Sequence, residues 1–124
     1  MKRIIIDLDN TLCFSDSNYR NALPNQAVID RLREYRANGF EIVVHTSRNM
    51  RTYEGRVGKI NVHTIPVILD WLQLYDVKFD ELVVGKPWCG DEGFYVDDRA
   101  IRPNEFVSLN LEEVAKLLGA GKVT

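Results

Sequence analysis

Long hydrophobic runs, a charge imbalance and a cysteine framework are all missing from this sequence. No apolar run approaches the roughly 18 residues of a membrane span, and Asp7 soon interrupts the apolar opening, so we expect neither a membrane helix nor a signal peptide. The net charge of -2 gives no basic surface for a polyanion, so nucleic acid is not an expected partner. Cys13 and Cys89 have neither the density of a disulfide framework nor the spacing of a zinc site. They indicate inert thiols in a reducing, cytoplasmic compartment.

What is present is an alternation of short apolar runs and helical patterns. The β-branched run Ile4 to Ile6 predicts a strand buried on both faces, and further strands are predicted at 40–45, 82–84 and 94–96. Apolar residues at helical spacing predict helices at 25–38, 64–75 and 111–118, with 46–62 irregular. We therefore predict the α/β class: one three-layer α/β/α Rossmann-like domain over residues 1–124, with a central, mainly parallel sheet.

Polar side chains follow each predicted strand, at the edge of the sheet where ligands usually bind. In chain order these residues are Asp7 and Asp9; Thr46, Ser47 and Arg48; Lys86; and Asp97, Asp98 and Arg99. Such a set suits Mg2+ and a phosphate, because Mg2+ favours one or two carboxylates together with phosphate oxygens. Asp7 and Asp97 would supply the carboxylates. Lys86 would place a positive charge beside the phosphoryl group, and Thr46 would donate a hydrogen bond to it.

These residues resemble the four signatures of the haloacid dehalogenase (HAD) superfamily. The first is the DLDNT stretch of residues 7–11, and Thr46, Lys86 and the Asp97-Asp98 pair match the other three in order. A DxDxT pattern alone would be weak, but four signatures that each follow a predicted strand are specific. The resemblance covers residues 4 to about 107.

The resemblance implies a role for each matching residue. Asp7 would be the nucleophile that forms an aspartyl-phosphate, and Asp9 the general acid and base. Asp7, Asp9, Asp97 and Asp98 would contact Mg2+, with the split between the last two left open. Thr46, Ser47, Arg48 and Lys86 would bind the phosphate. For Asp9 to reach the substrate, the chain must turn at about Leu8, because a continuing strand would fix the side chains of residues 7 and 9 on one face.

Family members that cleave other bonds lose the second aspartate of the first signature, so the retained Asp9 implies phosphate-ester hydrolysis. The short segments 12–24 and 48–61 leave no room for the cap domain that usually selects the substrate. Capless relatives act on large or exposed phosphates, or borrow a lid from a second subunit, so a homo-oligomer is one expectation.

Two longer stretches, residues 45–61 and 85–103, resemble small phosphatase-like proteins of bacterial capsule and surface-polysaccharide biosynthesis. The resemblance implies a small phosphorylated sugar or polyol as the substrate. Arg48, Arg51, Arg56 and Arg99 would bind its anionic groups, and Trp88 would stack on a sugar face.

Other interpretations stay open at this point. Thr46 and Ser47 can simply cap a turn, Asp98 can pair with Arg99 or Arg102, and His45 is expected to be structural. Two alternatives for the whole chain are a catalytically weak protein that binds a phosphate ligand or regulates a partner, and a phosphatase that acts on a macromolecular phosphate.

Overall fold

The computed structural model describes residues 1–120, and its internal contacts divide the chain into two compact units. The N-terminal unit is Met1–Trp88 and the C-terminal unit begins at Cys89. The prediction of one domain over residues 1–124 therefore stays a prediction.

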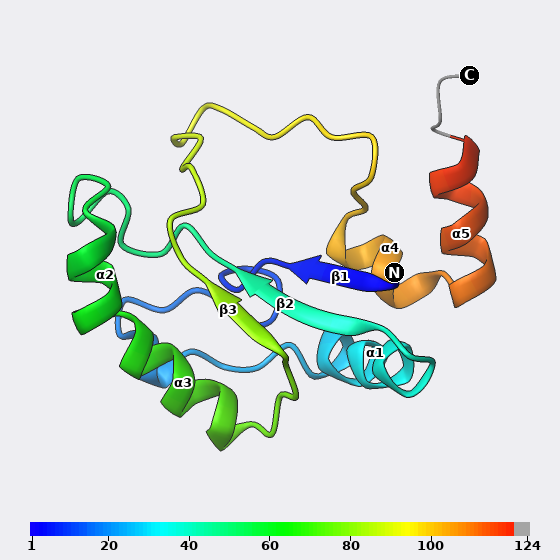
Figure 1. The fold of residues 1–124 in the computed structure, drawn as a ribbon, viewed down its shortest axis with the longest axis horizontal. Coiled ribbons are helices and arrows are strands. Elements are labelled where there is room, and N and C mark those ends of the chain that lie inside the picture. Colours follow the sequence, from blue (N-terminus) through cyan, green and yellow to red (C-terminus); the bar gives the residue numbers. More distant parts are fainter. Residues whose placement is uncertain (121–124) are drawn as a thin grey trace. The chain divides into compact units, whose positions relative to one another are not determined.

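The N-terminal unit holds a parallel sheet of three strands in the order β1, β2, β3 (Figure 1). These are β1 (Arg3–Ile6), β2 (Glu41–His45) and β3 (Glu81–Val83). In the register, Ile4 lies opposite Ile42 and Val44 lies opposite Leu82, with both pairs of strands parallel. The predicted α/β class with a parallel sheet is confirmed for this unit, and the first three predicted strands are present.

Helices connect the strands, as parallel pairing requires. They are α1 (Gln26–Ala37) between β1 and β2, and α2 (Val57–His63) and α3 (Ile65–Leu74) between β2 and β3. The periodicity that predicted α1 is confirmed, because Val28, Ile29, Leu32 and Tyr35 are all buried. Asn25 accepts a hydrogen bond from the Val28 N–H at its start, and Gly39, with φ of +90°, follows its end.

Two details predicted for the N-terminal unit are wrong. Residues 46–62 were expected to be irregular, but they include α2, whose Ile60 is fully buried. Gly58 and the surrounding polar residues hide that single apolar anchor from a periodicity argument. The predicted helix at 64–75 is present as α3, in which Ile68, Trp71 and Leu72 are buried and Leu69 is 42% exposed. Ile5 is 59% exposed, so β1, at the edge of the three-stranded sheet, is not buried on both faces.

The C-terminal unit holds α4 (Pro103–Ser108) and α5 (Leu111–Ala120). The last helix was predicted, whereas α4 was missed although Pro103 and Glu105 signal its start: the Glu105 carboxylate accepts the Arg102 N–H at 2.9 Å. The predicted strand at 94–96 is not formed. Val96 is 89% exposed there. The apolar run has the pattern of a strand, but a strand also requires a neighbouring strand to hydrogen-bond with.

A helix long and apolar enough to cross a membrane is not found within residues 1–120.

Candidate functional site

The chain turns directly after β1, as the sequence predicted. The Leu8 carbonyl accepts three main-chain N–H groups, from Thr11 at 3.3 Å, Leu12 at 2.9 Å and Cys13 at 3.2 Å. Asn10 has φ of +59°, a left-handed conformation that asparagine tolerates better than most residues. The turn buries Leu8 and Leu12 in the core. Because the chain turns here, the side chains of Asp7 and Asp9 do not share one face, as they would in a continuing strand.

Asp7 lies beside the residue that matches the third signature. The Lys86 Nζ is 3.9 Å from the Asp7 Oδ1, and the Thr11 hydroxyl donates a hydrogen bond of 3.4 Å to Oδ2. The Asp7 side chain is 35% exposed, so it is partly desolvated and still accessible. Burial raises the pKa of the Asp7 carboxyl, while the charge of Lys86 acts in the opposite direction. A partly exposed carboxylate beside an ammonium group is a suitable nucleophile for an anionic substrate.

Thr46 ties the ends of β2 and β3 to this site. Its N–H donates to the Val83 carbonyl at 3.0 Å, and its own carbonyl accepts the Lys86 N–H at 3.2 Å. The Thr46 side chain is almost completely buried, and its hydroxyl oxygen accepts the Arg48 N–H at 3.0 Å. That bond is also the local cap that the sequence left open for Thr46. The next residue, Ser47, is half-buried, and its carbonyl accepts the Met50 N–H.

His45, the last residue of β2, faces the same charges. Burial and the nearby Lys86 lower the pKa of its imidazole, and the Asp7 carboxylate opposes this. The neutral form is therefore favoured, which fits the structural role expected from the sequence.

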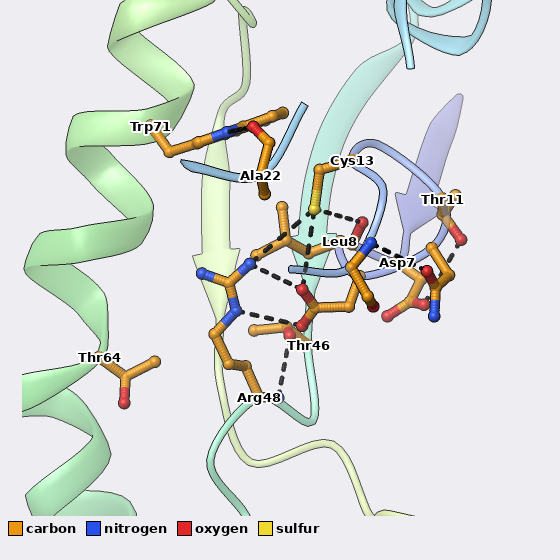
Figure 2. A network of polar contacts seen from close by, with 12 residues as sticks. Asp7, Leu8, Thr11, Cys13, Ala22, Thr46, Arg48, Thr64 and Trp71 are labelled. Atoms are coloured by element: carbon orange, nitrogen blue, oxygen red, sulfur yellow. Dashed lines mark hydrogen bonds and ion pairs between the residues drawn. The ribbon is translucent and has the colours of Figure 1, made fainter. Parts of the chain in front are cut away.

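Asp9 has a different partner from Asp7. The Arg48 guanidinium binds both Asp9 oxygens, with Nε at 3.1 Å from Oδ2 and Nη2 at 2.8 Å from Oδ1. The Arg48 side chain is only 2% exposed. Figure 2 shows it extending from the segment after β2 toward Cys13 and the turn after β1. A phosphate contact for Arg48, as predicted, would require the guanidinium to leave Asp9.

Two further residues, neither of them predicted to belong to the site, contact the Asp9–Arg48 pair. The Tyr19 ring lies against the Arg48 guanidinium, with its centroid 4.1 Å from Cζ. The buried Cys13 thiol approaches Asp9, with Sγ 3.7 Å from Oδ1. An isolated tyrosine in a polar loop carries no sequence signal for such a contact.

Asp97 and Asp98 lie in the C-terminal unit, so the structure does not test their predicted roles beside Asp7. The Asp97 Oδ1 accepts the Arg99 N–H at 2.8 Å, which closes a short turn. Both carboxylates are exposed. Within residues 1–120 there is no group of three or more acidic, histidine or cysteine side chains arranged around one point.

The remaining predicted substrate contacts are solvent-accessible. Arg51, Arg56 and Arg99 are exposed, and Trp88 is 48% exposed. Arg56 is the residue immediately before α2. The predicted substrate contacts of these four residues stay predictions.

Neither the protein-family models nor the curated proteins include a match to this chain. A solved structure does match: the crystal structure of a structural-genomics target from Vibrio cholerae, with 59% sequence identity and a TM-score of 0.96. The match covers 98% of this chain and 100% of that chain.

Proposed function

We propose that this chain, which belongs to the same family as the Vibrio cholerae protein, is a cytoplasmic, Mg2+-dependent phosphomonoesterase of the HAD type. The observation that carries the proposal is the Asp7 carboxylate, partly exposed at the end of β1, with the Lys86 ammonium group 3.9 Å away. Thr46, directly after β2, accepts the Lys86 N–H on its main-chain carbonyl, and β2 pairs with β1, which ends just before Asp7. The order of the four sequence signatures supports the same interpretation.

The fold proposed with this function is the three-layer Rossmann-like domain.

The donor set fits Mg2+, which takes few protein ligands and keeps several waters. Asp7 and Asp97 would hold the ion through their carboxylates, with Asp98 as a further ligand. Asp9 would contribute its main-chain carbonyl, as the predicted turn after Asp7 implies, and its two carboxylate oxygens contact Arg48. The ion would neutralise charge on the phosphoryl oxygens.

The reaction divides between Asp7 and Asp9. An Asp7 oxygen attacks phosphorus, the ester P–O bond breaks, and Asp9 gives a proton to the leaving oxygen. Asp9 then takes a proton from water, the water oxygen attacks phosphorus, and the bond to Asp7 breaks to release inorganic phosphate. Lys86 and Thr46 hold the phosphoryl oxygens throughout.

A small phosphorylated sugar or polyol of surface-polysaccharide biosynthesis is the proposed substrate. The support is the resemblance of residues 45–61 and 85–103 and the lack of space for a cap. Screening sugar phosphates, polyol phosphates, nucleotides and phosphopeptides tests this choice, and a preference for phosphopeptides or nucleotides would contradict it.

Hydrolysis of a generic aryl phosphate tests the activity itself. We expect turnover by the wild-type protein with Mg2+, loss of turnover with EDTA, and a loss of at least about 1,000-fold in Asp7→Asn, because the amide cannot act as the nucleophile. The matched control is Asp70→Asn, a change of the same chemistry at an exposed pair with Arg20. Wild-type protein that is folded but inactive with Mg2+, or active Asp7→Asn, would contradict the proposal.

A further inference from the structure

The pairing of Asp9 with Arg48 differs from every other ion pair described in the N-terminal unit. In those other pairs, such as Arg20 with Asp70, both side chains are at least 20% exposed, whereas the Arg48 side chain is 2% exposed. Two N–H groups of Arg48 contact the two Asp9 oxygens in the planar, bidentate arrangement that fixes a carboxylate most firmly. The orientation of the Asp9 carboxylate is therefore set by Arg48.

Arg48 is itself held on several sides. Tyr19 covers the face of the guanidinium, and the Arg48 N–H donates to the Thr46 hydroxyl oxygen. The third guanidinium nitrogen, Nη1, is buried and has no hydrogen-bond partner within residues 1–120. Moving Arg48 off Asp9 would leave a buried cation with still fewer partners, which is strongly unfavourable. Arg48 is therefore expected to stay bound to Asp9 and to keep its carboxylate in one orientation.

The rest of the Asp9 carboxylate is accessible, since its side chain is 27% exposed. A carboxylate has about four acceptor sites, and the Arg48 contacts use two of them. The Cys13 thiol, at 3.7 Å, adds only a weak contact. Asp9 can thus be fixed by Arg48 and still exchange a proton with a substrate oxygen.

We propose that Arg48 is a positioning residue: it holds Asp9 in the orientation from which Asp9 transfers the proton, and Tyr19 holds Arg48 in place. This inference rests on the proposed phosphatase function. It assigns to Arg48 a role through Asp9 in place of a contact with the phosphate. It also couples the loop that carries Tyr19 to the proton-transfer step.

Substrates with different leaving groups distinguish a role of Arg48 in positioning Asp9 from a direct contact with the phosphate. Dinitrophenol leaves without a proton, whereas the alkoxide of glycerol phosphate needs one. For a reaction with a covalent intermediate, kcat/KM reports the steps up to departure of the leaving group and excludes hydrolysis of the phosphoenzyme. The test is therefore kcat/KM of wild-type, Arg48→Met and Arg48→Lys proteins with both esters and Mg2+.

We expect Arg48→Met to lower kcat/KM about 100-fold for glycerol phosphate and less than about fivefold for dinitrophenyl phosphate, the range of a lost general acid. Arg48→Lys keeps the charge but not the bidentate contact, so it should show the same selectivity with a loss of about tenfold. In an Asp9→Asn background, Arg48→Met should add less than about threefold, because its partner is already gone. Arg33→Met, at an exposed pair with Asp30 on α1, is the control and should change neither rate.

Each outcome decides the inference. Equal losses for the two esters, a loss that persists in the Asp9→Asn background, or a gain in activity would overturn the positioning role. If Arg48→Met fails to fold by circular dichroism, Arg48→Lys carries the same comparison. A wild-type protein without Mg2+-dependent turnover of either ester would overturn the proposed function and this inference together, whereas the other failures overturn only the inference.

Discussion

Asp7 and Asp9 are two residues apart, yet their surroundings differ. Asp7 is partly exposed, near one ammonium group and one hydroxyl, whereas both Asp9 oxygens contact a buried guanidinium. A pair of carboxylates in unlike environments is the usual way to divide a nucleophile from a proton carrier. The resemblance predicted this division of roles, which stays a prediction, and the difference in surroundings is an observation that supports it.

How much of the site could be predicted depends on whether the signal is local. The proximity of Asp7, Thr46 and Lys86 follows from strand ends that meet at one edge of a parallel sheet, so the sequence was enough. The Arg48 contact with Asp9 joins residues 39 positions apart through two side-chain conformations. The burial preference of arginine also argues against predicting this contact, because an arginine in a sequence is expected to be exposed.

Cys13 offers a test of the packing around Asp9. Burial, and then the charge of Asp9, raises the pKa of the Cys13 thiol to about 11, so at pH 8 it is neutral and inaccessible. In a Cys89→Ser protein, which keeps only Cys13, we expect negligible labelling by iodoacetamide at pH 8 in the native state and complete labelling in denaturant. Equal labelling rates in the two states would contradict the buried position.

At the scale of elements, the loop before α1 is anchored to α3. The Trp71 indole N–H donates to the Ala22 carbonyl at 2.8 Å, and both residues are buried (Figure 2). This bond fixes the far end of the loop that carries Tyr19. The loop is thus held both at Arg48 and at α3.

Replacing Trp71 with phenylalanine should remove this anchor. The buried Ala22 carbonyl would lose its partner, which costs about 1–3 kcal/mol, and the smaller ring adds a packing loss. We expect urea unfolding to show a decrease of at least about 1 kcal/mol and proteolysis to cut the 14–22 loop faster. Trp88→Phe, at an exposed position, is the control; equal stability of the two variants would contradict the anchoring role.

The elements also show where sequence patterns stop being informative. α1 was predicted correctly because its four apolar positions all face the core of one unit. The run at 94–96 has the composition of a strand, but strand formation depends on pairing, which no local pattern encodes. For α2 the error was the opposite: a helix is present that the sequence did not predict. Its one buried isoleucine, in a segment that contains glycine, gives too little helical periodicity to detect.

At the scale of the whole molecule, the residues that match the four sequence signatures are distributed over both units. The N-terminal unit contains Asp7, Asp9, Thr46 and Lys86, and the C-terminal unit contains Asp97 and Asp98. The proposed role of each unit in Mg2+ binding can therefore be tested by substitution.

Substitution of Asp97 tests its predicted contact with Mg2+. Asp97→Asn should raise the Mg2+ concentration for half-maximal activity by about tenfold or more, since one of few protein carboxylates is lost. Asp98→Asn should have a smaller effect, and Glu112→Gln, at an exposed pair with Lys116 on α5, should have none. An unchanged Mg2+ requirement in Asp97→Asn would exclude that residue as a ligand, and a larger effect in Asp98→Asn would reverse the assignment of the two residues.

The most direct test of the central claim is to trap the covalent intermediate. The Asp9→Asn protein is mixed with dinitrophenyl phosphate and Mg2+, quenched in acid, digested and analysed by mass spectrometry. Dinitrophenol leaves without the general acid, but hydrolysis of the intermediate requires the missing base, so we predict hydroxylamine-sensitive phosphate on Asp7 at close to one per chain. Phosphate on another residue, or release of dinitrophenol without any phosphorylated Asp7, would contradict the account.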